Sequence, residues 1–329
     1  MSELAVAAFA ASTGAHLLDA PRSLRFARFA DTFDEASYLR ELALRGFRWV
    51  ARSDRRFPSR LRAIHDPPPG LFVRGDAPYS LLDRPTVAIV GARACSPYGT
   101  AVALAFAREL AAAGVVVVSG LARGVDAAAH RGALDAGATV AVLGCGIDRD
   151  YPRAHAALAA SIAERGLILS EYPPGVEPAP WRFPARNRIV AGLADATVVV
   201  EARERSGALI TGDLALDEGR EVFAVPGEIT SQLSRGTNAL LRLGAIPATC
   251  VDDVLEVLGL AGASAQPLPL EPRLETVRAA LAEAASGADE LVRRTGLTPG
   301  EVAAALAELE LLGLVDQGEG RYRATTIDM

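Results

Sequence analysis

The alternation of apolar and polar positions divides the chain into three regions. From residue 86 onwards, short apolar runs rich in β-branched residues alternate with stretches in which apolar residues recur at helical spacing. Runs that are apolar at successive positions are typical of parallel strands covered by helices on both faces. Such runs predict strands at residues 86–91, 115–120, 139–144, 167–171, 197–201 and 221–225. The pattern predicts the α/β fold class, with an extended Rossmann-like, doubly wound parallel sheet.

The two flanking regions have different patterns. Residues 1–80 predict a small helical N-terminal region, which ends at three consecutive prolines and leads into an edge strand at residues 71–76. Residues 261–270 are rich in proline and small residues, as expected of a linker. Beyond it, three helical patterns and a β-ribbon follow in the order of a winged helix. The predicted division of the chain is therefore 1–80, 81–260 (the Rossmann-like domain), 261–270 and 271–329.

Composition and charge narrow the class of partner. The net charge is −6, and every basic residue is arginine, so each cationic group is a planar, permanently charged, bidentate donor. A negative chain is not coated for non-specific nucleic-acid binding, so a nucleic-acid site is expected to be a local cluster. The third helix of the predicted winged helix contains Glu301, Glu308 and Glu310 but no arginine. That helix is poorly suited to a phosphate-lined groove, so we expect a protein-interaction or regulatory module.

Several classes of function are disfavoured by what the sequence lacks. No apolar run approaches the roughly 20 residues of a spanning helix, and no export signal precedes the first helix, so we expect a cytoplasmic protein without a membrane partner. Cys95, Cys145 and Cys250 are far apart and lack metal-ligand spacing, which predicts free thiols and no metal site. The turn after the first strand of the sheet is not G-x-G-x-x-G, and a P-loop needs a lysine, so neither NAD nor ATP is expected as a cofactor.

Glycines and arginines gather where the predicted strands end. Ligands of open parallel sheets bind outside the carboxyl ends of the strands, where glycine lets the backbone approach and arginine meets phosphate oxygens. Pro184 suits the first turn of a helix, so the arginines after it lie beside free backbone N–H groups, an anion-binding geometry. The predicted rim consists of Gly91, Arg93, Ser119, Gly120, Arg123, Arg153, Arg186, Asn187 and Arg188.

Two finer expectations concern this rim. The spacing of two between Arg186 and Arg188 puts them on different sides of a helix, so one is expected to face phosphate and the other to pair with Glu201 or Glu171. Among the aromatic residues of the rim segments, Tyr151 or Phe183 is expected to approach a base by stacking.

The candidates for acid–base chemistry are few. Glu201 ends a strand and could act as a general acid or base, or could pair with Arg186 or Arg188. His130 lies at helical spacing from Asp126, where capping or packing is more typical than catalysis. No Ser-His-Asp order is apparent, and no catalytic residue is assigned.

Eight motifs, in order over roughly residues 46–250, resemble the DprA/Smf family of DNA-processing proteins. They lie at residues 87–93, 119–126 with His130, 144–148 with Tyr151-Pro152, 170–175, 183–189, 200–202 with 206–211, 219–220 with 225–227, and 236–238. The resemblance implies a single-stranded DNA-binding, dimeric, non-enzymatic mediator that protects incoming DNA and loads the RecA recombinase during natural transformation.

The resemblance also implies site residues. Arg93 and Arg153 match basic DNA-contacting positions of the family, and Gly120, Arg123, Arg186 and Asn187 match the lining of the same pocket. The family often has lysine at the position of Arg153, so the arginine of this chain keeps the positive charge there. It usually has a small hydroxyl residue at the position of Ala92, and this chain lacks the corresponding hydrogen bond.

A hydrolase remains the alternative to the mediator. Cytokinin-activating phosphoribohydrolases have a related Rossmann core and act on a nucleotide phosphate, using a Pro-Gly-Gly-x-Gly-Thr turn near a catalytic glutamate. Here the corresponding residues 206–211 read Ser-Gly-Ala-Leu-Ile-Thr, which lacks that turn.

Overall fold

The structure is a computed structural model that describes residues 2–13, 24–260, 271–311, 314–318 and 321–324. The chain divides into two compact units, Met1–Ser264 and Ala265–Met329. The linker predicted at residues 261–270 lies outside the described residues. Within the described part, every helix is too short or too polar to cross a lipid bilayer.

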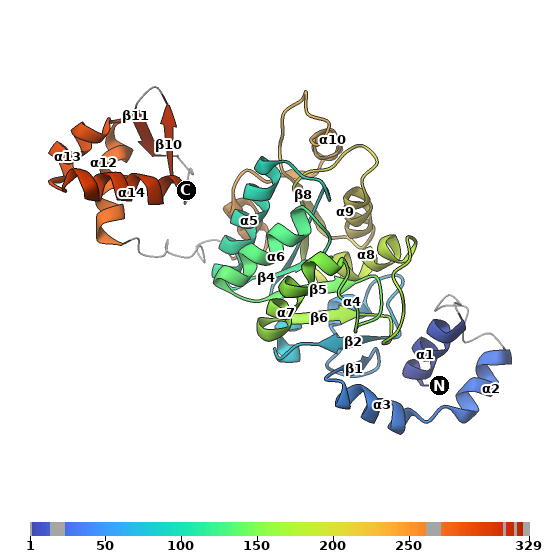
Figure 1. Cartoon of the computed structure of the whole chain (residues 1–329). Helices are drawn as coiled ribbons and strands as arrows, with labels where there is room; N and C mark the ends of the chain where they lie inside the picture. The colour runs from blue at the N-terminus through green and yellow to red at the C-terminus, as the bar shows by residue number, and fades with distance from the viewer. Residues whose placement is uncertain (1, 14–23, 261–270, 312–313, 319–320, 325–329) are drawn as a thin grey trace. The chain divides into compact units, whose positions relative to one another are not determined.

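The first unit is built on one nine-stranded sheet, in the order β1-β2-β6-β5-β4-β3-β7-β8-β9 among the described residues (Figure 1). The strands from β3 to β9 pair in parallel, and β2 joins β6 in antiparallel orientation. Chain order reverses between β3 and β7, as in a doubly wound sheet. The strands are β1 (Arg48–Ala51), β2 (Gly70–Arg74), β3 (Thr86–Val90), β4 (Val116–Ser119), β5 (Thr139–Leu143), β6 (Leu167–Ser170), β7 (Ala196–Val199), β8 (Glu221–Ala224) and β9 (Ile246–Pro247).

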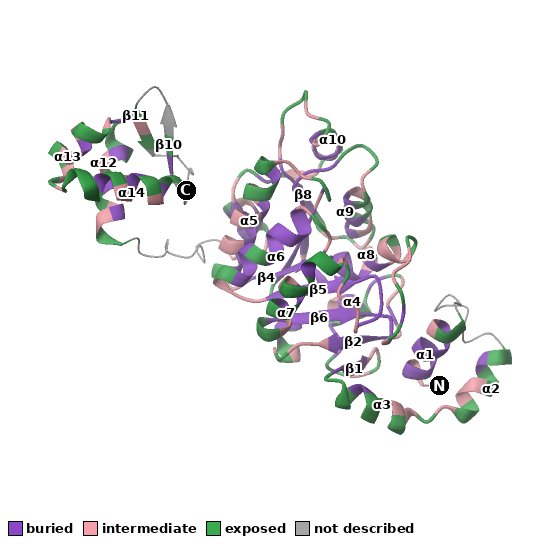
Figure 2. Ribbon diagram, in the orientation of Figure 1, coloured by how far each residue is buried: buried purple, intermediate pink, exposed green. Residues whose placement is uncertain are grey.

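Helices cover both faces of this sheet, so the predicted fold class is confirmed (Figures 1 and 2). One face packs against α4, α8, α9 and α10, and the other packs against α5, α6, α7 and α11. The helices of this unit are α1 (Glu3–Thr13), α2 (Leu24–Thr32), α3 (Glu35–Leu44), α4 (Ser59–Arg62), α5 (Pro97–Ala112), α6 (Val125–Ala136), α7 (Ala156–Arg165), α8 (Arg182–Leu193), α9 (Gly207–Asp217), α10 (Arg235–Arg242) and α11 (Val251–Val257), with 3₁₀ turns η2 (Tyr79–Asp83) and η3 (Arg153–His155).

The predicted strands match β3 to β8 within one or two residues, but the sheet is wider than expected. The strand predicted at residues 71–76 is β2, and it is not an edge strand, because β1 pairs with it on its outer side. β1 and β9 were not predicted. β1 is only four residues long within a helical region, and β9 has two residues, so neither has a recognisable period.

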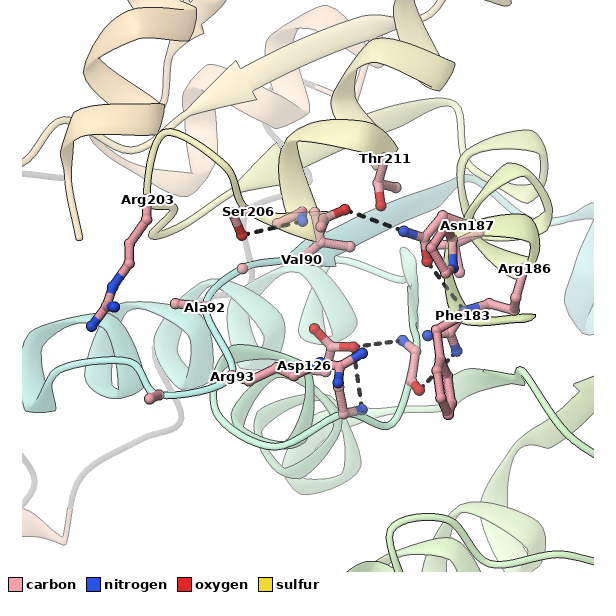
Figure 3. Close-up of a pocket in the computed structure, with 18 of the residues that line it drawn as sticks. Val90, Ala92, Arg93, Asp126, Phe183, Arg186, Asn187, Arg203, Ser206 and Thr211 are labelled. Carbon is pink, nitrogen blue, oxygen red and sulfur yellow. Dashed lines mark hydrogen bonds between the residues drawn. The ribbon is translucent and has the colours of Figure 1, made fainter. Parts of the chain in front are cut away.

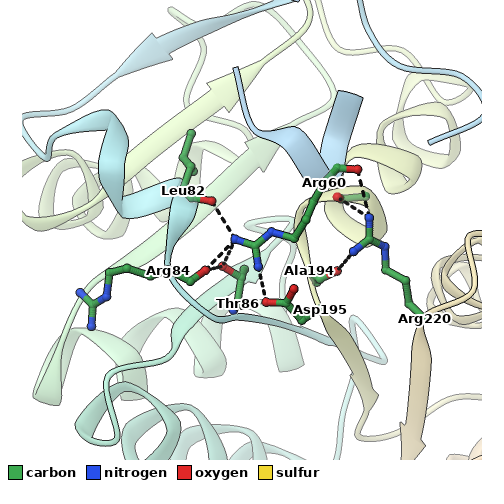
Figure 4. Close-up of polar contacts among 8 residues, drawn as sticks. Arg60, Leu82, Arg84, Thr86, Ala194, Asp195 and Arg220 are labelled. Carbon is green, nitrogen blue, oxygen red and sulfur yellow. Dashed lines mark hydrogen bonds and ion pairs between the residues drawn. The ribbon is translucent and has the colours of Figure 1, made fainter. Parts of the chain in front are cut away.

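An arginine of α4 secures the amino ends of the two central strands (Figure 4). The Arg60 guanidinium donates to the carbonyl oxygen of Leu82 at 2.8 Å and to that of Arg84 at 2.6 Å, and it pairs with Asp195. The Asp195 carboxylate also accepts a hydrogen bond of 2.8 Å from the backbone N–H of Thr86, where β3 begins. These contacts hold β3 and β7 together at the end of the sheet opposite to their carboxyl ends.

A second arginine extends this network. Arg220, which precedes β8, donates to the carbonyl oxygen of Ala194 at 2.7 Å and to those of Gly192 and Arg60 at 3.1 Å. Burial lowers the pKa of Arg220. Structural contacts therefore occupy the amino ends of β3 and β7, at the opposite end of these strands from the turn after β3.

The second unit has the order of a winged helix, as predicted. Three helices, α12 (Pro272–Glu283), α13 (Ala288–Thr295) and α14 (Pro299–Leu311), precede an antiparallel pair, β10 (Val315–Gly318) and β11 (Arg321–Ala324). Tyr322 of β11 also forms a bridge with Ser286, between α12 and α13. The apolar positions that predicted helical faces form the core of this unit, namely Leu274, Val277, Leu281, Val302, Leu306 and Leu309.

Candidate nucleic-acid interface

A pocket of about 370 Å³ opens at the carboxyl end of β3, beside the point where the strand order reverses (Figure 3). Its walls come from the turns after β3 and β4, the first turns of α6 and α8, and the loop from β7 into α9. Of the residues predicted from the sequence, Gly91, Arg93, Gly120, Phe183, Arg186 and Asn187 line it. The topology therefore brings together residues that lie up to 96 positions apart, from Gly91 to Asn187.

Arg186 is the buried centre of this pocket, with only 4% of its surface exposed. Its Nη1 donates to the carbonyl oxygen of Gly120 at 2.8 Å and to that of Val142 in β5. Burial lowers its pKa, and the Asp126 carboxylate acts in the opposite direction. A Cβ at Gly120 would lie 2.4 Å from Arg186 Nη2, so glycine is needed there for the guanidinium to fit. Arg186 thus ties α8 to the ends of β4 and β5 while facing the pocket.

Asp126 binds two backbone N–H groups of the turn after β4. Its Oδ2 accepts hydrogen bonds from the N–H of Gly120 at 3.1 Å and of Ala122 at 3.3 Å. Burial raises the pKa of Asp126, while the nearby Arg186 lowers it. An anionic ligand of the pocket must therefore be met by arginine side chains rather than by the backbone of this turn.

An arginine and two aromatic rings stack beside the pocket. The Arg93 guanidinium lies 5.4 Å from the centre of the Phe183 ring, and the Phe183 and Tyr151 rings stack with their centres 5.3 Å apart. Tyr151 is 41% exposed, and Arg93 is exposed. A cation next to an exposed aromatic platform suits a ligand that carries both phosphates and bases.

Two of the predicted arginines lie outside the pocket on adjoining segments. Arg123 follows Ala122 in the turn after β4, and Arg153 begins η3, two residues after Tyr151. Both side chains are exposed, and neither has a hydrogen bond or ion pair with any described residue. Their charges are therefore free to meet a ligand.

The structure does not bring Ser119 or Arg188 to the pocket. Ser119 is fully buried, and its hydroxyl donates to the carbonyl oxygen of Ile89 at 2.6 Å. Arg188 forms two hydrogen bonds with Glu171, at 2.9 and 2.7 Å, and an ion pair of 3.0 Å with Asp66. Burial lowers the pKa of Arg188, but the attraction and the hydrogen bonds of the Glu171 carboxylate together outweigh this effect, so the net shift of the pKa is upward. The predicted pairing of one of the two arginines with Glu171 is confirmed for Arg188. Arg186 lines the pocket, and its contact with phosphate stays a prediction.

Glu201, the other partner considered for an arginine of α8, does not pair with either arginine. The Glu201 carboxylate accepts hydrogen bonds from the backbone N–H of Ser96 at 2.9 Å and from its hydroxyl at 2.5 Å. Glu201 is 4% exposed and does not line the pocket. The reason is local: Ser96 caps α5, and its helix N-terminus attracts a carboxylate.

Sequence reasoning missed three polar residues of the pocket. Arg203, Arg205 and Thr211 line its far wall, in the loop after β7 and the first turns of α9. Figure 3 shows Arg203 on the opposite side of Asp126 from Phe183. Their signal was present, because both arginines lie between the end of a predicted strand at residue 201 and the Ser206–Thr211 segment. The lining therefore contains four arginines, namely Arg93, Arg186, Arg203 and Arg205, and a single carboxylate, that of Asp126.

His130 has a packing role, as expected. It is fully buried, and its Nδ1 lies 2.8 Å from the hydroxyl of Thr139, which itself donates to the carbonyl oxygen of Val117. Because that hydroxyl proton is already used, His130 must donate from Nδ1. Burial lowers the pKa of His130 to about 3, so the ring is neutral at pH 7.

The three cysteines are free thiols, as predicted. Cys145 is buried, and burial raises its pKa to about 11, while Cys95 and Cys250 are partly exposed. Across the ranges that the structure describes, no three His, Cys, Asp or Glu side chains are arranged to hold a metal ion.

The sheet topology and the pocket together define an α/β protein of the extended Rossmann type, with arginines lining a pocket at the carboxyl ends of its strands. A family model described as DNA recombination-mediator protein A matches residues 48–259, and one described as DprA winged helix domain matches residues 261–321. The chain therefore belongs to the DprA/Smf family, as the motifs indicated.

Known proteins agree with this assignment. A putative DNA processing protein DprA of Mycobacterium tuberculosis is 41% identical over 309 residues, which cover 88% of this chain and 79% of the relative. Protein Smf of Escherichia coli is 40% identical over 283 residues, covering 81% and 74%. The crystal structure of DprA from Streptococcus pneumoniae has a TM-score of 0.66 at 39% identity, covering 78% of this chain and 92% of the other.

A further solved structure concerns the ligand of a relative. It is described as showing the single-stranded DNA binding mode of DNA processing protein A from Helicobacter pylori. Its TM-score is 0.59 at 34% identity, and the match covers 64% of this chain and 95% of the other.

The buried neutral His130 predicts how stability depends on pH. The unfolded chain binds a proton at this histidine below about pH 6.5, whereas the folded chain does not until about pH 3. Stability from this residue is therefore complete above pH 6.5 and is lost as the pH falls, by on the order of 1.4 kcal/mol per pH unit. His130→Asn keeps a donor near the Nδ1 position without titrating. Between pH 6.5 and 4.5 its unfolding free energy should therefore fall by roughly 2 kcal/mol less than that of the wild type, which is that slope integrated over the interval.

Urea unfolding at several pH values measures this difference. His65→Asn is the matched control, because His65 is exposed, and its pH profile should follow that of the wild type. Equal slopes for His130→Asn and the wild type would contradict the prediction.

Proposed function

We propose that this chain is a single-stranded DNA-binding recombination mediator that protects incoming DNA and loads the RecA recombinase onto it during natural transformation, in the cytoplasm. The observation that carries the proposal is the pocket at the carboxyl end of β3, where four arginines face one carboxylate in a chain of net charge −6. Such a local excess of positive charge is the electrostatic footprint of a phosphate backbone. Family membership and the ligand of the Helicobacter pylori relative support the same ligand.

The stacked rings favour a single strand over a duplex. Stacking on Tyr151 and Phe183 requires bases that are not paired and stacked within a helix, and each stacked base contributes on the order of 1–3 kcal/mol. Arg93 lies on the Phe183 ring, and Arg123 and Arg153 are unpaired among the described side chains, so cations adjoin the platform. The interface therefore offers both of the contacts that single-stranded nucleic acid uses.

We propose a binding function rather than an enzymatic one. The hydrolase alternative needs a catalytic glutamate, and Glu201 is turned away from the pocket to bind Ser96. Asp126, the carboxylate that does line the pocket, already accepts two backbone hydrogen bonds. Base release from nucleoside monophosphates that disappears in Glu201→Gln would favour the hydrolase.

The winged helix keeps its proposed role as a protein-interaction or regulatory module. Glu301 and Glu308 of α14 are engaged within the unit, Glu301 with the N–H of Thr298 at 2.8 Å and Glu308 with Arg273 at 2.8 Å. These contacts leave α14 acidic and without an arginine, which is unfavourable for a phosphate-lined groove.

Reversing two exposed arginines should abolish strand binding. Arg93→Glu combined with Arg153→Glu replaces two cations by anions at the rim, so affinity for a single-stranded oligonucleotide should fall at least 100-fold in fluorescence anisotropy. Each neutralised phosphate contributes about 0.7 to the salt slope of a single strand. The double variant Arg93→Ala, Arg153→Ala should therefore lower that slope by about 1.4.

The matched control is Arg55→Glu with Arg131→Glu, two exposed arginines outside the pocket lining. Unchanged affinity in the rim variant would refute the proposed site.

RecA loading is tested on strands already coated with single-strand binding protein. The wild-type chain should shorten the lag before RecA ATP hydrolysis begins on such strands, because it holds the strand while RecA nucleates. With the Arg93→Glu, Arg153→Glu variant, the lag should equal that of a reaction to which no mediator is added. A wild-type chain that binds the strand but does not change the lag would contradict RecA loading while sparing DNA binding.

We also propose that the chain forms a homodimer through this unit, using an apolar surface on α9 and after α10. Ile210 is 41% and Leu216 53% exposed on α9, and Leu243 is 85% exposed at the end of α10. Both helices pack on the same face of the sheet. Exposed apolar groups that share a face are typical of protein interfaces.

Leu216→Asp with Leu243→Asp should convert the dimer to a monomer, because two carboxylates would lose hydration in the interface. Sedimentation velocity measures the change in mass. Leu44→Asp is the control, since Leu44 is 89% exposed on a different element, and it should remain dimeric. A wild-type chain that is monomeric at tens of micromolar, or a double variant that stays dimeric, would rule out this interface.

A further inference from the structure

The turn between β4 and α6 is held in a conformation that its sequence disfavours. Leu121 has a φ of 58°, the left-handed region in which a leucine is rare, and among the described residues it is the single non-glycine residue with a positive φ. Its side chain is fully buried. Such a conformation persists only where the surroundings determine it, and it is commonly found at functional sites.

Three side chains from different elements hold this turn. Asp126 of α6 accepts from the N–H groups on either side of Leu121, at 3.1 and 3.3 Å, and Arg186 of α8 donates to the carbonyl oxygen of Gly120. His155, at the end of η3, lies with its Nδ1 3.0 Å from the carbonyl oxygen of Leu121. A carbonyl oxygen can only accept, so His155 donates from Nδ1.

The contact of His155 differs from the other two because it joins two arginine-bearing segments. Leu121 lies two residues before Arg123, and His155 lies two residues after Arg153. Both arginine side chains are exposed and have no hydrogen-bond or ion-pair partner in the described ranges, so their charged groups are positioned through the backbone segments that carry them. His155 itself is only 8% exposed, so it does not compete with them for a ligand.

We propose that His155 is a positioning residue for strand binding: its hydrogen bond to Leu121 sets the spacing of Arg123 and Arg153, so that both meet phosphates of the same strand. This inference rests on the proposed function and adds a residue that touches no nucleic acid. Backbone segments tied together present their arginines with less freedom to lose on binding, which favours the bound state.

Substitutions at this residue separate positioning from packing. In His155→Asn, the side-chain nitrogen can occupy the place of His Nδ1. In His155→Leu, the side chain fills similar space without a donor, and in His155→Gln the nitrogen lies one bond further out. His155→Leu and His155→Gln should bind a single-stranded oligonucleotide about tenfold more weakly than the wild type, with a salt slope lower by about 0.7 for one lost phosphate contact. His155→Asn should bind within about threefold of the wild type.

A double-mutant cycle completes the test. If His155 acts through the arginines, His155→Leu should have little further effect once Arg123 and Arg153 are both replaced by alanine. Circular dichroism confirms that each variant is folded, and His155→Gln serves if His155→Leu is not. Three outcomes would each overturn the proposal. The first is wild-type affinity in both His155→Leu and His155→Gln, and the second is failure of His155→Asn to restore binding. The third is a full effect of His155→Leu in the Arg123→Ala, Arg153→Ala background. A wild-type chain that does not bind the strand overturns the proposed function as well, so the two failures are distinguishable.

Discussion

The buried Arg186 guanidinium is the interaction on which the binding site depends. A charge in the interior is tolerated only when its donors are satisfied, and here the carbonyl oxygens of Gly120 and Val142 accept from Nη1. Those carbonyls end two neighbouring strands, so satisfying one side chain of α8 also fixes the mouth of the sheet. Gly120 must lack a side chain for this to happen. Much of the geometry of the pocket follows from accommodating a single guanidinium.

The other polar groups of the site divide into those that hold the structure and those that remain exposed. Asp126, Glu201 and Arg188 are each consumed by contacts within the protein, whereas Arg93, Arg123 and Arg153 remain exposed. Because arginine always carries its charge, these roles cannot be separated by titration and are set by geometry alone. A chain of net charge −6 can therefore present exposed arginines at this rim, since the nearby carboxylates of Asp126, Glu171 and Glu201 are bound within the protein.

Hydrophobic periodicity and the positions of glycine and proline in the sequence were enough to predict the sheet from β3 to β8, the winged-helix order and six residues of the pocket lining. Strand ends that carry glycine and arginine point to the carboxyl edge of a parallel sheet, and Pro184 indicated the start of α8. β1 and β9 escaped prediction because strands of four and two residues have no period to recognise. Arg203 and Arg205 were missed because the loop that carries them reaches the pocket from the far side of the strand reversal.

By itself, the sequence determined which elements form, and it predicted an arginine-rich site at the carboxyl edge of the sheet, because periodicity, turn residues and charge are local properties. Tertiary structure alone decided the partner of each side chain. Ser119 and Arg188 looked like rim residues, yet one bonds to Ile89 and the other to Glu171. It also decided that Asp126 fills the backbone donors of the turn and that His155 reaches Leu121. Those choices depend on distances between segments far apart in the chain, which no local pattern encodes.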